Sequence, residues 1–191
     1  MLKRKAIERF RFWKAHKTKQ ALLVTGAHQV GKSYLIDEFA RQSYSHVASF
    51  DFVENPTAAK TLAGATDATD FAFRISALSQ EPLVPGETAV VFDEIQECPE
   101  VLTYIKYLVD QGDYDYILSG SLLGVALEGV RSLPVGYVTE VQMYPLDFEE
   151  FCWAQGVPAS VLPSLARNAA QAEPVPDYLH NRLTNLFKRY L

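Results

Sequence analysis

Eight consecutive residues near the N-terminus have the types and the spacing that hold a chain of phosphates. They follow the pattern G-x-x-x-x-G-K-[ST] and are Gly26, Ala27, His28, Gln29, Val30, Gly31, Lys32 and Ser33. Glycines let the backbone N–H groups converge on phosphate oxygens, and a helix that begins near Gly31 adds the positive end of its dipole. Lys32 would reach the β- and γ-phosphates, and the Ser33 hydroxyl would bind Mg²⁺. We therefore predict a nucleotide site, and we include in it Tyr34, which follows the motif.

Two adjacent acids follow a second apolar run. The stretch "TAVVFDE" carries four apolar residues into Asp93 and Glu94. In open α/β sheets, ligands bind at the carboxyl ends of the strands, which is where these acids would lie. Asp93 is placed to hold Mg²⁺, usually through water, and Glu94 to polarise an attacking water as a general base.

Two serines, Ser119 and Ser121, stand at the end of the stretch "YILSGS" and form a third polar group. In the additional-strand class of P-loop ATPases, a strand between those of the phosphate loop and the acidic pair ends in a polar residue that senses the γ-phosphate. Either serine fits that role. A simple turn after the strand explains the same residues equally well.

The elements that must position these residues alternate along the chain. Strands are expected at 21–26, 46–52, 88–94, 114–120 and 137–145, with helices between them that include 31–42, a broken helical stretch at 55–80 and 99–111. Such alternation predicts a mostly parallel sheet covered by helices on both faces. The expected fold is a three-layer α/β/α P-loop NTPase domain of the additional-strand class, and the helical stretch should break around Gly64.

We expect three regions: a basic N-terminal helix at 1–20, an ATPase core at 21–146 and a helical extension at 147–191. In the extension, helices are expected at 146–154 and 176–191, separated by a segment that contains proline and alanine.

The N-terminal region carries eight basic residues against one acid, Glu8, although the whole chain has a net charge of −5. This asymmetry is typical of an arm that binds nucleic acid or a membrane surface. The interpretation that we favour is an amphipathic helix with a solvated basic face, because apolar residues recur at three- and four-residue intervals at Leu2, Ala6, Ile7, Phe10 and Trp13.

Other features exclude several protein classes. No apolar run approaches the roughly 18 residues that a membrane span needs, and the N-terminus lacks the apolar segment of a secretory signal. Cys98 and Cys152 are too few for a disulfide framework, and the four histidines are scattered, so no metal cluster is visible. We therefore expect a soluble cytoplasmic protein with reduced thiols.

Four stretches, in this order, resemble a known family: "TGAHQVGKSYLI", "VVFDEIQECPE", "YILSGS" and "MYPLDFEEF". They are similar to the bacterial and archaeal AAA-like ATPases of the AAA domain type fourteen, in which a second domain of unknown function follows the ATPase domain. The resemblance covers nearly the whole chain. It implies a P-loop fold, ATP and Mg²⁺ as ligands, and Glu94 as the catalytic glutamate, but no known cellular process.

The chain departs from this family at two positions and in length. The family commonly has arginine where this chain has His28, and arginine or lysine where it has Tyr137, so we expect slow hydrolysis if either cation contacts the γ-phosphate. The family also continues beyond a segment like "LTNLFKRYL". We expect the helices after Asp147 to begin a connection to further structure, leaving without cover the apolar side chains of Leu183, Leu186, Phe187 and Leu191.

These observations favour a Mg²⁺-dependent ATPase that can form homo-oligomers. The alternative is an ATP-gated binding module whose partner is a protein or a nucleic acid, the latter bound through Lys3, Arg4 and Lys5. A kinase for a small acceptor is a further possibility, but residues 51–85 contain only Lys60 and Arg74 as bases for a substrate lid. No Asn-Lys-x-Asp guanine reader is present, which favours ATP over GTP.

Overall fold

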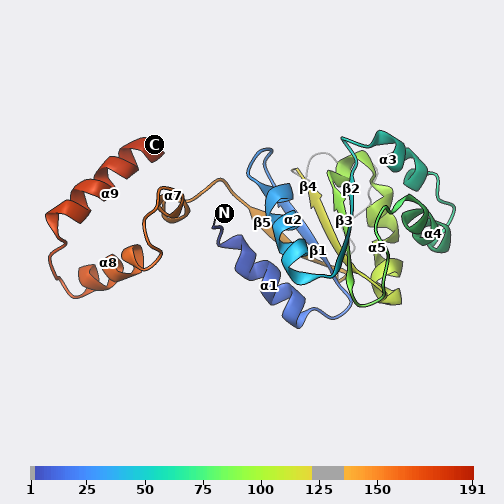
Figure 1. Cartoon of the computed structure of the whole chain (residues 1–191), viewed down its shortest axis with the longest axis horizontal. Coiled ribbons are helices and arrows are strands. Elements are labelled where there is room, and N and C mark those ends of the chain that lie inside the picture. The colour runs from blue at the N-terminus through green and yellow to red at the C-terminus, as the bar shows by residue number, and fades with distance from the viewer. Residues whose placement is uncertain (1–2, 122–135) are drawn as a thin grey trace. The chain divides into compact units, whose positions relative to one another are not determined.

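The computed structural model describes residues 3–121 and 136–191 (Figure 1). Its contacts divide the chain into two compact units. The larger unit comprises residues 6–143, and the smaller one comprises residues 144–191 together with the arm that ends at Lys5. Each unit is described by itself below.

The larger unit alternates helices and strands in the expected order. Its elements are α1 (Ala6–His16), β1 (Ala21–Gly26), α2 (Lys32–Ser43), β2 (His46–Asp51), α3 (Pro56–Ala63), α4 (Ala68–Leu78), β3 (Thr88–Asp93), the 3₁₀ turn η1 (Ile95–Glu97), α5 (Glu100–Gln111), β4 (Asp115–Gly120) and β5 (Val138–Met143). The break expected around Gly64 is present, since this residue caps the C-terminus of α3.

The five strands form one sheet in the order β2-β3-β4-β1-β5, and all four pairings are parallel. The predicted α/β fold class is therefore confirmed. β4 lies between β1 and β3, so the strand that ends in Ser119 and Gly120 separates the strand of the phosphate loop from the strand of the acidic pair. This is the arrangement of the additional-strand class.

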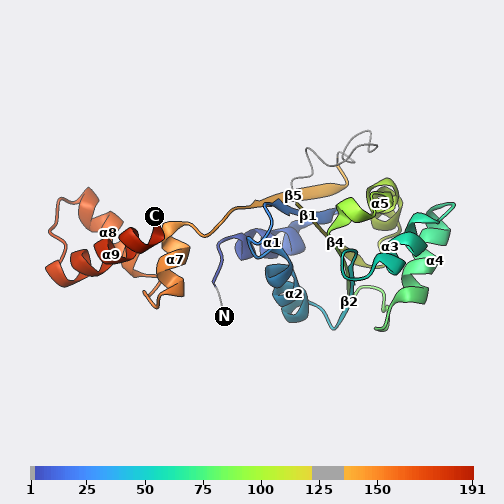
Figure 2. The ribbon, with the colours of Figure 1, turned by 90° about the horizontal axis from the view of Figure 1, so that it is seen from above.

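Helices cover both faces of the sheet (Figures 1 and 2). On one face, Phe10 and Trp13 of α1 and Phe39 of α2 pack against the side chains of β1, β3 and β5. On the other face, α3, α4 and α5 pack against alternate residues of the same sheet. The apolar stripe of the basic helix is thus a core element, because Phe10 and Trp13 are both fully or almost fully buried.

Gly26, the first residue of the phosphate loop, packs tightly against the end of β5. Its φ is +149°, and a Cβ atom added there would lie 2.3 Å from the carbonyl oxygen of Met143, its partner in the sheet register. Backbone atoms cannot move out of the way as a flexible side chain could. Only glycine fits at this point, so the sheet itself determines how the loop begins.

We predict that Gly26→Ala will destabilise the larger unit much more than Gly86→Ala will. Both positions have a positive φ, at +149° and +77°, but nothing lies within 4 Å of a Cβ atom added at Gly86. Backbone strain costs about 1–3 kcal/mol, and only the first substitution adds a clash. Thermal unfolding of the two variants beside the parent protein measures the difference. Equal losses would show that the contact with Met143 carries no energy.

The smaller unit is helical and has a core of its own. It contains α7 (Phe148–Ala154), α8 (Val161–Ala170) and α9 (Asp177–Tyr190), which lie together in Figures 1 and 2. Cys152, Val157 and Leu186 are its buried apolar residues. α7 begins with a capping box, in which the side chains of Asp147 and Glu150 each accept a bond from the other's backbone N–H.

The sequence interpretation missed α8, which lies inside the segment treated as a separator. Pro163 is the third residue of α8. A proline in the first turn is tolerated, because its missing N–H would have no partner within the helix. We expected four apolar side chains of the C-terminal helix to be exposed, and this is correct only in part. Leu186 is buried and Leu183 partly buried, whereas Phe187 and Leu191 are exposed.

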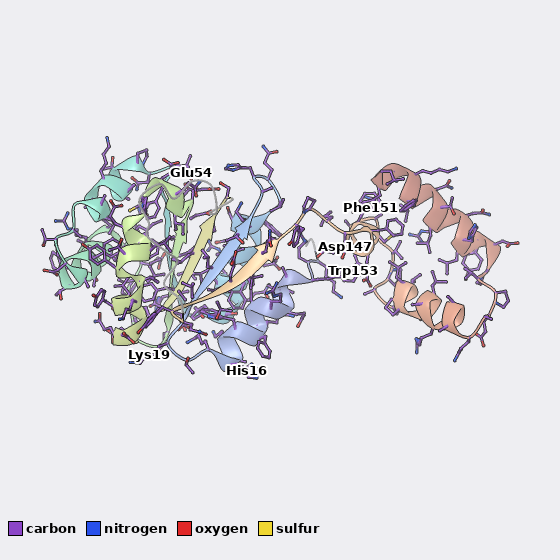
Figure 3. All side chains as sticks on the ribbon, turned by 180° about the vertical axis from the view of Figure 1, so that it is seen from behind. His16, Lys19, Glu54, Asp147, Phe151 and Trp153 are labelled. Carbon is purple, nitrogen blue, oxygen red and sulfur yellow. The ribbon has the colours of Figure 1, made fainter. Side chains whose placement is uncertain are left out.

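The basic arm before α1 is bound to the start of α7 by charged contacts. Arg4 and Glu150 are both buried, with Nε and Oε1 3.3 Å apart, and Arg4 Nη2 donates to the carbonyl of Tyr144 at 2.6 Å. Lys5 Nζ lies 2.7 Å from the carboxylates of both Asp147 and Glu149. Figure 3 shows Asp147, Phe151 and Trp153 along this part of the chain.

We predict that Arg4→Met will destabilise the smaller unit by about 3 kcal/mol, because it leaves the buried carboxylate of Glu150 without its charged partner. Arg11→Met is the matched control. The ion pair of Arg11 with Glu8 is exposed, so its loss should change stability by less than about 0.5 kcal/mol. Urea denaturation of the parent protein and both variants, followed by far-UV circular dichroism, measures both. Similar small losses would show that the buried pair does not stabilise the unit.

Candidate nucleotide site

The predicted phosphate loop connects β1 to α2 at the carboxyl edge of the sheet. Gly26 is buried, the loop residues Ala27, His28 and Gln29 are exposed, and Val30 is anchored in the core below α2. Two residues in the loop have left-handed backbone conformations, Gln29 with φ 63° and Gly31 with φ 88°. The loop is therefore held between a fixed strand and a fixed helix while its tip faces solvent.

The N-terminus of α2 has no side-chain cap. Gly31 stands at the N-cap position, and no acidic residue lies in the first turn. The first N–H groups of a helix have no partner within it, so an uncapped N-terminus attracts anions. Ser33 and Tyr34 are exposed in this turn, so both side chains are open to a ligand at the helix start.

Lys32 is held inside its own loop. Its side chain is 4% exposed, and Nζ donates to the carbonyl oxygens of Gly26 at 3.1 Å and Ala27 at 3.0 Å. An ammonium group has three donors, and the two carbonyls use two of them. The charge is thus fixed beside the loop's N–H groups before any ligand arrives, and a bound phosphate would compete with the carbonyls for it.

Asp93 and Ser119 meet at the ends of neighbouring strands. The Ser119 hydroxyl donates to Asp93 Oδ1, which also accepts the backbone N–H of Glu94 at 3.0 Å. Both side chains are buried. Ser119 therefore has a defined partner at the acidic edge, and its predicted role as a sensor of the γ-phosphate stays a prediction.

The donor set at this edge suits Mg²⁺. The Ser119 hydroxyl and the Glu94 N–H both bond to Asp93 Oδ1, so Oδ2 is the oxygen that would take the ion or its water. Within residues 3–121 and 136–191, no group of three metal-ligating side chains occurs. Mg²⁺ fits such a site, because it usually keeps several waters and takes one or two protein ligands together with phosphate oxygens.

Glu94 turns out of β3 in a strained conformation. Its φ of 55° and ψ of 53° are left-handed, which is uncommon for a residue with a side chain. Among the described residues only Gln29, Glu94 and Ala172 share this property without being glycine, and two of these three belong to the predicted site. Such strain concentrates at functional positions.

Gln96 is the residue that the sequence interpretation missed. Its Nε2 donates to Glu94 Oε2 at 2.5 Å and approaches Ser121 Oγ at 3.4 Å. A glutamine in "DEIQECP" gives no signal of this contact, because the contact depends on the left-handed turn at Glu94.

Tyr137 lies at the amino-terminal end of the strands, whereas the phosphate loop lies at their carboxyl end. It directly precedes β5, and its carbonyl accepts the N–H of Ala21, the first residue of β1. β1 then runs from Ala21 to Gly26, five steps that at about 3.3 Å each span about 17 Å. A basic residue at position 137 would therefore not reach the phosphate loop of the same chain. The expectation of slow hydrolysis rests on His28 alone.

Cys98 and Cys152 are both free and buried. Burial raises the pKa of the Cys98 thiol to about 12, so it stays protonated at neutral pH. No helix in the described parts of the chain is long and apolar enough to cross a bilayer.

The comparison with protein families decides the family. A model described as an AAA domain, the fourteenth type of that name, matches residues 18–152, more than half of the chain. The chain belongs to this AAA domain family. AAA membership supports a nucleotide-binding, ATPase-type function. No curated protein matches the sequence.

The comparison with solved structures gives two matches of low sequence identity. Hsp104 in a closed state with ATPγS and FITC casein matches with a TM-score of 0.50 and 15% identity, over 77% of this chain and 27% of the Hsp104 chain. C. elegans PCH-2 matches with a TM-score of 0.45 and 15% identity, over 91% of this chain and 47% of the other. The chain thus spans less than half the length of both proteins.

Proposed function

We propose that this AAA domain binds ATP with Mg²⁺ and hydrolyses it slowly. The observation that carries the proposal is the placement of two groups at one sheet edge. The loop of residues 26–33 follows β1, and the side chain of Lys32 is bonded to carbonyl oxygens of this loop. Asp93 is the last residue of β3, and it accepts a hydrogen bond from Ser119 of β4, the strand that lies between β1 and β3. In this proposal residues 21–146 form the ATPase core and 147–191 its helical extension.

Each residue has a distinct role in this reaction. The N–H groups of the loop and the ammonium of Lys32 would hold the phosphates, and the Ser33 hydroxyl and Asp93 would hold the metal ion. Mg²⁺ would neutralise charge that develops on the phosphate oxygens. Glu94 would take a proton from a water molecule as the water oxygen bonds to the γ-phosphorus, while the bond from the γ-phosphorus to the ADP oxygen breaks and phosphate is released. Glu94 Oε1 is suited to this, since it accepts no hydrogen bond within the described residues.

Slow turnover follows from position 28. His28 is exposed and stands where the resemblance to the family implies an arginine, so no permanent positive charge is supplied there. An arginine that contacts the transferred phosphate can raise the rate by roughly 10³–10⁵.

As a binding partner of this domain, we favour a second copy of the chain over nucleic acid. A nucleic-acid arm needs basic side chains that are available to phosphates. Here Arg4 and Lys5 are engaged by acids, and Lys3 Nζ lies 4.7 Å from the centre of the Trp153 ring. The arm's charges already have partners within the chain, which favours a structural role for the basic helix.

We predict that calorimetric titration will detect binding of Mg²⁺-ATP and Mg²⁺-ADP, and that Lys32→Ala will weaken it at least about 100-fold by removing the only ammonium held inside the described loop. Lys106→Ala is the matched control. Lys106 is an exposed lysine of α5 whose ammonium lies 5.2 Å from the ring of Tyr137, at the far edge of the sheet.

Phosphate release from the same samples tests the chemical step. Glu94→Gln should keep nucleotide affinity within about threefold and lower release at least about 100-fold, because the amide cannot act as a base. ATP binding without release by the parent protein would favour the ATP-gated binding module. No binding at all would contradict the proposed function.

A further inference from the structure

We propose that Gln96 is the positioning residue for Glu94: its side-chain amide holds one oxygen of that carboxylate and leaves the other to the attacking water. This inference rests on the proposed function, because it assigns a role within the same reaction. Neither the family match nor the structural comparisons give Gln96 any role.

The geometry of the pair is the first argument. Gln96 Nε2 lies 2.5 Å from Glu94 Oε2, a short distance for a hydrogen bond to a charged acceptor. Glu94 Oε1 has no hydrogen-bond partner among residues 3–121 and 136–191. A carboxylate anchored through one oxygen cannot rotate freely, so its second oxygen keeps a fixed direction.

The backbone between the two residues is rigid, which makes the anchor effective. η1 follows Glu94 directly, with hydrogen bonds from Glu97 N to Glu94 O at 3.0 Å and from Cys98 N to Ile95 O at 3.1 Å. The side chains of Ile95 and Cys98 are fully buried on either side of Gln96. Gln96 is therefore held by a turn whose neighbouring residues are fixed in the core.

The amide also has a defined orientation. Glu94, when ionised, can only accept hydrogen bonds, so Gln96 must present its NH₂ group to it. Its Oε1 is buried and has no hydrogen-bond partner in the part of the chain that the structure describes. Turning the amide around would bring Oε1 toward the carboxylate and repel it. The orientation that leaves Oε1 unsatisfied is thus maintained by the bond to Glu94.

The same amide links Glu94 to the end of β4. Nε2 lies 3.4 Å from the hydroxyl oxygen of Ser121, which is buried. Since Ser119, two residues earlier, is bonded to Asp93, the strand end touches both acids, one directly and one through Gln96. A displacement of this strand end would therefore shift Asp93 and Glu94 together.

The test compares two methionine variants of the full chain. Gln96→Met preserves the length of the side chain and removes the donor. Gln111→Met is the matched control, because Gln111 makes the same kind of bond on the surface, from Nε2 to Asp113 Oδ2 at 2.7 Å, also two residues along. We expect Gln96→Met to lower kcat of ATP hydrolysis by about 10- to 100-fold, the range that a small misplacement of a reacting group can cost. The affinity for ATP should stay within about twofold, and Gln111→Met should change neither.

A double-mutant cycle separates positioning from a merely structural role. A residue that acts only through Glu94 has nothing left to position once the base is gone, so adding Gln96→Met to Glu94→Gln should lower residual hydrolysis no further. An equal further loss in that background, or a parallel fall in ATP affinity and thermal stability, would overturn the assignment. So would an unchanged kcat in Gln96→Met.

The outcomes also separate this inference from the proposed function. If the parent protein hydrolyses ATP and Glu94→Gln does not, but Gln96→Met is fully active, only the role of Gln96 is wrong. If the parent protein releases no phosphate, Glu94 has no catalytic role, and the role of Gln96 falls with it.

Discussion

The site depends on one constraint, the parallel pairing of β1 with a neighbour on each side. β4 pairs with one edge of β1 and β5 with the other, so the direction and the end point of β1 are fixed by backbone hydrogen bonds rather than by loops. Gly26 meets the last residue of β5 so closely that no side chain fits. The phosphate loop therefore begins at a point that the sheet determines, and its remaining residues need only turn the chain into α2.

The polar groups at this edge are arranged before a ligand binds. Lys32 is bonded to loop carbonyls, Ser119 to Asp93, and Gln96 to Glu94. Lys32, Asp93 and Ser119 are buried. Buried polar groups are costly unless they are paired, so the bonds of these three residues stabilise the fold at this edge. Nucleotide binding would exchange partners at Lys32 while leaving the two acids in place. In this account the strain at Gln29 and Glu94 is balanced by the packing of Val30 and Ile95, which follow them and are buried.

The sequence predicted those features that follow from local patterns. The apolar runs "ALLV" and "AVVF" are buried strands, and the phosphate motif lies between a strand and a helix as its chemistry requires. α8 was missed because proline and alanine were read as signs of a separator, although the proline stands in the first turn. The left-handed turn at Glu94 has no sequence signal, and so the contact of Gln96 could not be foreseen. Likewise, the contacts of Arg4 join residues about 145 positions apart, which no local pattern indicates.

Hydrogen–deuterium exchange with and without Mg²⁺-ATP tests the central claim most directly, because the claim is that backbone N–H groups of residues 27–33 hold the phosphates. The account predicts slower exchange in peptides that cover this loop and the first turn of α2. In Lys32→Ala, Mg²⁺-ATP should not alter the exchange rate of these peptides. Exchange in peptides from α9 should be unaltered by Mg²⁺-ATP in both proteins. Unaltered exchange in the loop while ATP binds, or protection confined to the smaller unit, would contradict the account and place the nucleotide elsewhere.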